Sequence, residues 1–253
     1  MSDLAIMERL VPAVREAGNA IMEIYAQPVE ADEKADGSPV TEADRAAEAI
    51  LLAALVVVAP DIPVVSEENS GSHTLAPTAA YFLVDPLDGT REFLRRDGQG
   101  AFTVNIGLIR EGVPVAGVVF APALDRMFVG AAGEGAHEYC GALGTALSIR
   151  ACPADGAVAV ASRSHRDAET DAWLAAHEIR ETVSTGSSLK FCLIAAGEAD
   201  VYPRFGPTME WDTAAGDAVL RAAGGRVECT EGKLFRYGKP AYRNTAFIAR
   251  GNA

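Results

Sequence analysis

The spacing of apolar residues predicts two helices at the start of the chain. Apolar side chains recur every three or four positions over residues 4–25, as they do on one face of a helix. Pro12 falls inside this pattern and is expected to kink the helix or to mark its real start. Thr41 followed by Asp44 has the spacing of a capping box, which predicts a second helix that runs to about residue 59.

The pattern then changes from helical spacing to short apolar runs. Residues 27–40 are polar and rich in helix breakers, which predicts a loop. The runs 62–66 and 79–84 are short and apolar and predict two strands. Turn residues separate the next β-rich runs, so we expect an antiparallel meander. Its predicted strands are 101–109, 113–123 and 126–133.

Strand and helix patterns alternate in the last part of the chain, which indicates a layered α/β arrangement. The predicted strands are 158–162, 179–184 and 200–203, and the predicted helices are 168–177, 187–199 and 209–225. We therefore expect two halves. Residues 1–145 would form an N-terminal α+β half that holds the metal site, and residues 146–253 a C-terminal α/β half that binds substrate.

Composition and charge restrict the possible functions. About half of the 253 residues (49%) are apolar, which is enough for a sizeable core. The formal net charge of −13 argues against nucleic-acid binding, because such proteins usually carry a basic surface. A small anionic ligand remains compatible with this charge, since a few local cations or bound metal ions can reverse the field in one cleft.

The remaining sequence features favour a reducing compartment. The four cysteines have neither the spacing of a zinc site nor that of a disulfide framework. The N-terminus lacks the charged and apolar regions of a signal peptide, and the longest apolar run, 49–60, is too short to span a bilayer. That run is expected to be a buried helix end. We expect a cytoplasmic protein, either a monomer or a homodimer.

Acidic residues stand at places where a chain usually avoids charge. Glu67 and Glu68 directly follow one predicted strand, and Asp85 and Asp88 follow the next. Asp212 stands at the start of a predicted helix, behind a segment rich in breakers. Carboxylates at several strand ends are suited to a hard cation, because Mg²⁺ takes oxygen ligands and shares its shell with substrate phosphate. The pattern therefore predicts metal-assisted phosphoryl transfer.

Neighbouring residues support this hypothesis, but each acidic position also has a plainer interpretation. Gly89 would let the backbone approach a ligand closely, and Thr90 offers a hydroxyl that could orient water. Alternatively, Asp88 and Gly89 form a common turn pair, Glu67 lies at a solvated strand end, and Asp212 caps a helix. Asp44 could serve the capping box alone. Only the joint order of these residues favours a metal site.

Two long motifs resemble a known family. The stretch "DPLDGT" at 85–90, with "WDTAAGDAVLRAAGG" at 211–225, resembles the inositol monophosphatase superfamily of Mg²⁺-dependent, lithium-sensitive phosphatases. The stretch "GSSLKFCLIAAGEADVYPRFGPTMEWDTAAG" at 186–216 is similar to its 3′(2′),5′-bisphosphate nucleotidase branch. The resemblance covers nearly the whole chain. The loop around Gln99 is longer than is usual in that branch.

The resemblance implies a five-layer αβαβα sandwich that hydrolyses 3′-phosphoadenosine 5′-phosphate to AMP and phosphate. It implies two or three Mg²⁺ ions, whose expected ligands are Glu67, Asp85, Asp88, Asp212 and the backbone carbonyl of Leu87. Thr90, oriented by Asp44, would help Glu67 to position and deprotonate the attacking water. The backbone of Gly89 and Thr90 would hold the scissile phosphate.

A bisphosphate substrate also needs cations for its second phosphate. The candidates are Arg163, His165, Lys190 and Arg204. Lys190 and Arg163 have a plainer interpretation as solvated surface charges, as does His165. The residues implied to contact substrate are Leu87, Asp88, Gly89, Thr90, Arg163, His165, Lys190, Arg204 and Asp212.

Two other interpretations remain open. A sister phosphatase of the same superfamily would act on inositol, histidinol or sugar phosphates, because substrate choice within one fold depends on loops. A metal-binding regulator without catalytic activity would be expected to have lost one of the five key residues. Glu67, Asp85, Asp88, Thr90 and Asp212 are all present. The partner that we expect is a small phosphorylated nucleotide, with neither nucleic acid nor an integral membrane segment involved.

Overall fold

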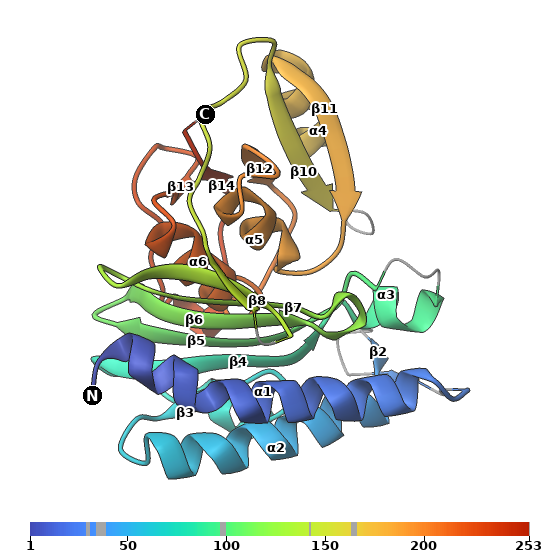
Figure 1. Cartoon of the computed structure of the whole chain (residues 1–253), viewed down its shortest axis with the longest axis vertical. Coiled ribbons are helices and arrows are strands. Elements are labelled where there is room, and N and C mark those ends of the chain that lie inside the picture. The colour runs from blue at the N-terminus through green and yellow to red at the C-terminus, as the bar shows by residue number, and fades with distance from the viewer. Residues whose placement is uncertain (29–30, 34–38, 97–99, 142, 163–165, 253) are drawn as a thin grey trace.

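The chain folds into five stacked layers, which confirms the predicted αβαβα sandwich (Figure 1). The computed structural model describes residues 1–28, 31–33, 39–96, 100–141, 143–162 and 166–252. From one side to the other, the layers are two long helices, a seven-stranded sheet, two short helices, a five-stranded sheet and one outer helix. Three hydrophobic clusters fill the spaces between these layers.

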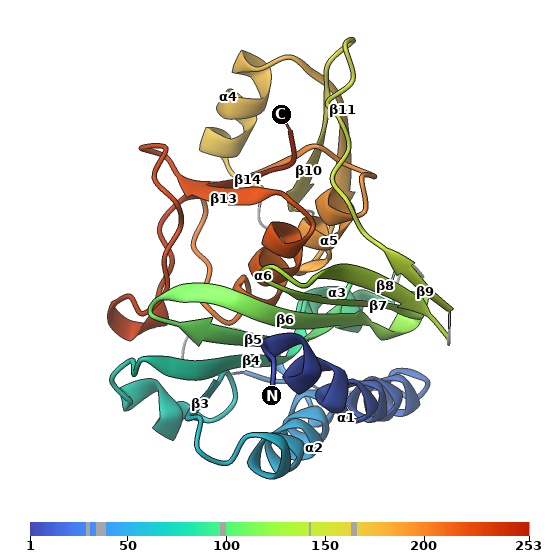
Figure 2. The same ribbon diagram turned by 60° about the vertical axis from the view of Figure 1, so that its left-hand side comes forward.

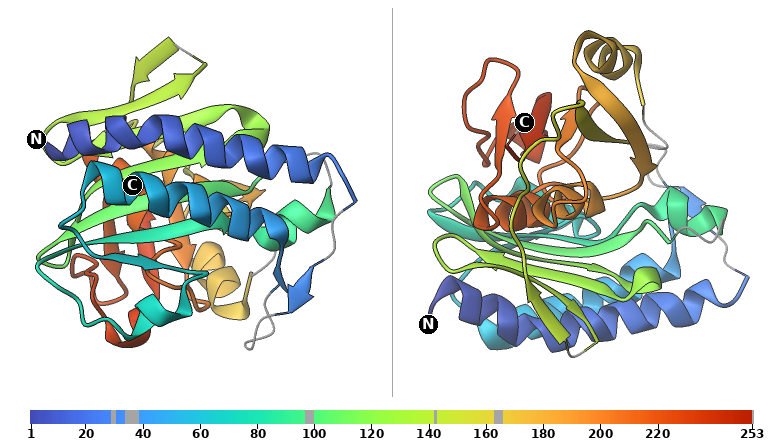
Figure 3. Two further views of the ribbon diagram at one scale, coloured as in Figure 1. Left: turned by 90° about the horizontal axis from the view of Figure 1, so that it is seen from below. Right: turned by 45° about the horizontal axis from the view of Figure 1, so that its top comes forward.

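Helices α1 (Asp3–Tyr25) and α2 (Glu42–Val58) form the first layer and lie side by side across one face of the sheet (Figure 3). Pro12 lies inside α1, which begins nine residues before it, so the proline neither starts nor ends this helix. The end of α2 differs from the prediction, because Val56 and Val57 are exposed. Among the described residues, no helix is long and apolar enough to cross a membrane.

The second layer is the seven-stranded sheet, with strand order β3-β4-β5-β6-β7-β8-β9. Strand β3 pairs with β4 in parallel, and the strands from β4 onward form the predicted antiparallel meander. The last two strands were not predicted. The bounds are β3 Val64–Ser66, β4 Ala80–Asp88, β5 Thr103–Arg110, β6 Val113–Ala121, β7 Arg126–Ala131, β8 Gly135–Cys140 and β9 Leu143–Ala146.

The five-stranded sheet is the fourth layer, with strand order β11-β10-β12-β14-β13. Strand β10 is parallel to both of its neighbours, whereas β14 is antiparallel to both of its own. The bounds are β10 Ala157–Ser162, β11 Ile179–Thr185, β12 Val201–Arg204, β13 Arg226–Cys229 and β14 Phe247–Arg250. Helix α4 (Ala168–Ala176) covers the outer face of this sheet, where Leu174 joins an apolar cluster (Figure 2).

Helices α5 (Leu189–Ala195) and α6 (Ala214–Ala222) form the middle layer and join the two sheets. Two glycines on the seven-stranded sheet let α6 approach closely. A Cβ at Gly107 would lie 2.7 Å from Ala214 Cβ, and one at Gly117 would lie 2.4 Å from the carbonyl oxygen of Ala215. This contact fixes the start of α6, and with it the preceding turn, against the centre of the first sheet.

A small hairpin stands where the sequence predicted only a loop. Strands β1 (Asp32–Glu33) and β2 (Pro39–Val40) pair with each other, and residues 34–38 between them lie outside the described part. The longer loop expected around Gln99 also lies outside the described residues. The division into halves at residue 145 stays a prediction.

The close packing at Gly117 makes it sensitive to one added methyl group. We expect Gly117→Ala to lower the free energy of unfolding by about 1–3 kcal/mol, because the backbone of α6 must shift. Urea denaturation measures this change. Gly71→Ala is the matched control, since its Cβ would meet nothing nearer than 3.4 Å. Equal stability of Gly117→Ala and the native protein would contradict the packing described here.

Candidate active site

Three carboxylates from distant parts of the chain meet where the seven-stranded sheet faces the turn before α6. Oxygen atoms of Glu67, Asp85 and Asp212 all lie within 4.8 Å of one another. Glu67 directly follows β3, Asp85 belongs to β4, and Asp212 belongs to the turn before α6. Among the described residues, this is the one group of three or more potential metal ligands that was found. The acidic positions noted in the sequence are therefore brought together.

The parallel pairing of β3 and β4 places Glu67 beside Asp85. Ser66 is the register partner of Val84, and the backbone N–H of Glu67 donates to the carbonyl of Val84 at 3.1 Å. Ser66 is itself held, because its hydroxyl donates to Glu48 at 2.5 Å. Glu67 is partly buried, and its carboxylate belongs to the cluster with Asp85 and Asp212.

Strand β4 extends farther than predicted and includes both aspartates. Its register with β5 is irregular between Asp85 and Asp88, around Pro86. The side chain of Asp85 is buried, and its Oδ1 accepts a hydrogen bond from the N–H of Leu87 at 3.1 Å. Asp88 is half-buried and faces a pocket. The irregular segment thus presents two carboxylates inside the molecule rather than in an exposed turn.

Asp44 serves two purposes at once. It completes the predicted capping box, in which the N–H and the hydroxyl of Thr41 both donate to its Oδ2 at 2.7 Å. Its other oxygen lies 3.3 Å from the hydroxyl of Thr90, which also lies 3.2 Å from the carbonyl oxygen of Leu87. Gly89 turns the chain into α3 (Thr90–Arg95) with a φ of 93°, in the left-handed region that favours glycine.

Asp212 is held by a turn and does not cap a helix. Its Oδ2 accepts a hydrogen bond from the N–H of Met209 at 2.7 Å, and the N-cap of α6 is Thr213. Glu210 in the same turn is fully buried, and its carboxylate accepts from the N–H groups of Gly238 and Lys239 at 2.8 and 2.9 Å. This anchoring fixes the position from which Asp212 meets the other two carboxylates.

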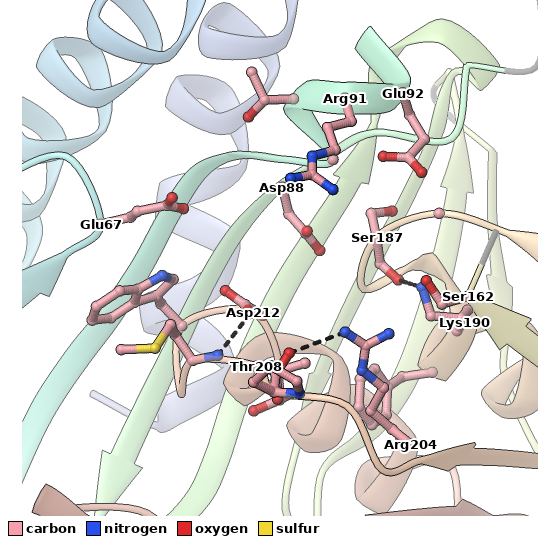
Figure 4. Close-up of a pocket in the computed structure, with 18 of the residues that line it drawn as sticks. Glu67, Asp88, Arg91, Glu92, Ser162, Ser187, Lys190, Arg204, Thr208 and Asp212 are labelled. Atoms are coloured by element: carbon pink, nitrogen blue, oxygen red, sulfur yellow. Dashed lines mark hydrogen bonds between the residues drawn. The ribbon is translucent and has the colours of Figure 1, made fainter. Parts of the chain in front are cut away.

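A pocket of about 390 Å³ opens beside the carboxylates (Figure 4). Glu67, Asp88 and Asp212 line it, and so do the cations Lys190 of α5 and Arg204 of β12. The pocket therefore has an acidic side for a cation and a basic side for an anion. The other charged residues that line it are Arg91, Glu92 and Arg243.

Lys190 is buried, so its interpretation as a solvated surface lysine is wrong. Its side chain is 4% exposed, and its ammonium donates to the carbonyl of Ser187 at 2.5 Å. The same ammonium lies 5.1 Å from the centre of the Tyr202 ring. Arg204 is also buried, and it donates to the carbonyls of Gly206 and Pro207 at 3.1 and 3.0 Å. These contacts aim both cations into the pocket rather than into solvent.

Burial and crowding of like charges perturb the titration of this site. Burial, reinforced by the neighbouring carboxylates, raises the pKa of Asp85 and that of Asp212 well above their usual range. Burial raises the pKa of Asp88 to about 7, against the opposing effect of Lys190. Burial also lowers the pKa of Lys190 to about 8, although the charge of Asp88 opposes this shift. Ionisation of all these carboxylates is therefore unfavourable unless a cation is bound among them.

Several residues of the site were not found from the sequence. The N–H of Ser188 donates to Asp88 Oδ2 at 2.6 Å. Trp211 lines the pocket and stacks on His73, with the two ring centres 4.7 Å apart. The sequence carried no signal for these contacts, because each joins segments that are far apart in the chain. Two predicted substrate residues, Arg163 and His165, lie outside the described residues.

Comparisons with known proteins agree with this geometry. The model of the Inositol monophosphatase family matches residues 4–252. The 3′(2′),5′-bisphosphate nucleotidase CysQ of Salmonella typhimurium is 47% identical over 235 residues, which are 92% of this chain and 94% of that protein.

Solved structures give the same result. CysQ from Bacteroides thetaiotaomicron superposes with a TM-score of 0.84 at 36% identity, covering 100% of this chain and 99% of the other. An inositol monophosphatase from Anabaena superposes with a TM-score of 0.77 at 26% identity, covering 100% and 93%. The chain therefore belongs to the inositol monophosphatase family, and within it to the CysQ group.

Proposed function

We propose that this protein is a metal-dependent 3′(2′),5′-bisphosphate nucleotidase that converts 3′-phosphoadenosine 5′-phosphate to AMP and phosphate. One observation carries this proposal: a carboxylate cluster and two buried cations, Lys190 and Arg204, line the same pocket. A single dianionic phosphate at the metal site would not require the second pair of charges. The CysQ relatives, which are named for this activity, support the same substrate class.

The donor set fits a hard divalent cation. All the candidate side chains are carboxylates, and oxygen ligands of this kind are preferred by Mg²⁺. The residues that would hold two or three such ions are Glu67, Asp85, Asp88 and Asp212, with the carbonyl of Leu87. When bound, such ions would neutralise part of the phosphate charge and would lower the pKa of a water molecule bound to them.

The chain itself would orient the attacking water through Thr90 and Glu67. When the hydroxyl of Thr90 donates its proton to Asp44 Oδ1, 3.3 Å away, its oxygen is left to accept a proton from water. The carboxylate of Glu67, which lines the same pocket, can accept the second proton of that water. Asp44 acts here as a positioning residue, since the capping box fixes its carboxylate.

Backbone N–H groups at the turn after β4 would hold the scissile phosphate. Gly89 and Thr90 both line the pocket, and the left-handed φ of Gly89 requires a residue without a Cβ. A phosphate can therefore approach the backbone closely at this point. The transition state would be stabilised mostly by positioning and by charge, as is general for phosphoryl transfer.

The second phosphate would bind to Lys190 and Arg204. Both side chains are almost completely buried, so an anion that reaches them is shielded from water and interacts strongly. Arg163 and His165 stay predicted contacts of the substrate. The expected cytoplasmic location and the monomeric or dimeric state also stay predictions.

Phosphate release from a panel of substrates tests the proposed function. With Mg²⁺, we expect kcat/KM for 3′-phosphoadenosine 5′-phosphate to exceed that for AMP, inositol 1-phosphate and histidinol phosphate by at least about a hundredfold, because two charge-assisted contacts are added. Fructose 1,6-bisphosphate, which has two phosphates but no adenosine, should also be a poorer substrate. Asp88→Asn should abolish turnover with every substrate while the circular dichroism spectrum is retained. A preference for inositol or histidinol phosphate would overturn the assigned substrate.

Lys190 provides a test of the second-phosphate contact. We expect Lys190→Met to raise KM for the bisphosphate by about 10- to 100-fold, because a charge-assisted hydrogen bond is lost, and to change KM for a monophosphate much less. Steady-state kinetics on both substrates measure this difference. Lys233→Ala, which removes an exposed lysine, is the control. Equal effects of Lys190→Met on both substrates would remove Lys190 from the pocket's function.

The raised carboxylate pKa values predict that metal binding depends on pH. Below a pH of about 7 the metal-free Asp88 holds a proton, which the ion must displace. The dissociation constant for Mg²⁺ should therefore fall about fivefold between pH 6 and pH 7 and change less above that. The proton on Asp88 also stabilises the metal-free fold, because the unfolded chain releases it more easily. The metal-free fold should therefore lose this stability as pH rises through 7.

Isothermal titration calorimetry at a series of pH values measures the dissociation constant directly. Thermal unfolding in EDTA measures the accompanying change in stability. A dissociation constant that is the same at pH 6 and at pH 8 would contradict the described crowding of carboxylates.

A further inference from the structure

A buried polar bridge connects the seven-stranded sheet to the turn that begins α5. Thr103 and Asn105 lie on the same face of β5, and Ser188 immediately precedes α5. The first two side chains are fully buried and Ser188 is 2% exposed. Buried hydroxyl and amide groups destabilise a fold unless they are hydrogen-bonded, so three of them together at one contact call for an explanation.

The three side chains form a closed ring of hydrogen bonds. The Ser188 hydroxyl donates to Asn105 Oδ1, the Thr103 and Ser188 hydroxyl oxygens lie 3.0 Å apart, and Asn105 Nδ2 donates to Thr103 Oγ1 at 3.1 Å. One set of proton positions satisfies all these contacts. In it, Ser188 donates to Asn105, Asn105 donates to Thr103, and Thr103 donates to Ser188. Each hydroxyl therefore donates once and accepts once, which fixes the side chain of Ser188.

Two members of the ring, Thr103 and Ser188, contact Asp88. Thr103 is the register partner of Asp88 in the pairing of β4 with β5. The N–H of Ser188 donates to Asp88 Oδ2 at 2.6 Å. Ser187, directly before Ser188, has a φ of 54°, an uncommon value for a residue with a Cβ. The backbone and the carboxylate of Asp88 are thus fixed by members of the same ring.

We propose that Thr103, Asn105 and Ser188 are positioning residues for the metal site, which they serve by holding Asp88 Oδ2. This inference rests on the proposed function. Within the described residues, Asp88 Oδ1 accepts none of the hydrogen bonds found, so it is the oxygen that is available to a cation. Because Lys190 follows Ser188 by two residues, the ring also sets the distance between the metal ligand and the second-phosphate contact.

If the ring of Thr103, Asn105 and Ser188 had only a structural role, its removal would affect stability and not metal binding. If the ring only tied α5 to the sheet, its loss would lower the melting temperature but would leave the affinity for metal unchanged. Residues that orient a metal ligand typically change metal affinity or activity by about 10- to 100-fold when they are removed. Metal affinity therefore separates the two roles.

Thr103→Val tests the proposal, because it removes one hydroxyl with little change in volume. Thr103→Ser is the matched control, since it keeps the hydroxyl. Isothermal titration calorimetry with Mg²⁺, without nucleotide, should give a dissociation constant about tenfold or more higher for Thr103→Val, and within about threefold of the native value for Thr103→Ser. Ser188→Ala, which keeps the N–H but loses the ring, should weaken Mg²⁺ binding in the same way.

Each outcome decides between the claims. Native Mg²⁺ affinity in Thr103→Val would overturn the positioning role and leave the proposed function intact. If Thr103→Val does not fold, which circular dichroism would reveal, Ser188→Ala gives the same decision. If the native protein binds no Mg²⁺ and releases no phosphate from the bisphosphate, both the proposed function and this inference fail.

Discussion

Repulsion between carboxylates is the constraint on which the rest of the site depends. Glu67, Asp85 and Asp212 approach one another within 4.8 Å, and Asp88 lines the pocket beside them. Burial and mutual repulsion raise the pKa of Asp85, of Asp88 and of Asp212, so such a group is unfavourable on its own. A bound cation would relieve the repulsion between these carboxylates and would therefore bind favourably. This explains why the fold holds the side chains together.

The fold supplies the restraints that keep the carboxylates from separating. The capping box fixes Asp44, the turn around Glu210 fixes Asp212, and the ring around Ser188 fixes Asp88. The close approach of α6 to Gly107 and Gly117 then presses the turn of Asp212 against the first sheet. Acidic residues come mainly from the first sheet, whereas Lys190 and Arg204 belong to α5 and β12, so both sides of the pocket depend on the contact between the layers.

Much of this arrangement could be predicted from the sequence where the signal is local. The capping box of Thr41 and Asp44 and the meander are confirmed in the structure because adjacent residues determine them. The acidic residues of the "DPLDGT" stretch lie in the carboxylate cluster and the pocket beside it. The burial of Lys190 could not be predicted, because a lysine in an apolar helix usually extends to solvent. Its burial depends on Tyr202, which only the folded chain brings beside its ammonium.

The polar residues of β5 show a signal of intermediate strength. Thr103 and Asn105, two positions apart in an apolar strand, must face the same side of the sheet. That pattern indicates a buried polar contact, but the partner, Ser188, lies more than eighty residues away and could not be identified from spacing. Strands β13 and β14 were missed for a similar reason, since their pairing depends on long-range contacts rather than on local alternation.

Anomalous diffraction from crystals grown with Mn²⁺, AMP and phosphate would test the central claim most directly. We expect Mn²⁺ peaks in contact with the carboxylates of Glu67, Asp85, Asp88 and Asp212, and the 5′-phosphate of AMP beside Lys190 and Arg204. Mn²⁺ peaks away from these carboxylates, or a nucleotide phosphate bound elsewhere while the two cations face only solvent, would contradict it.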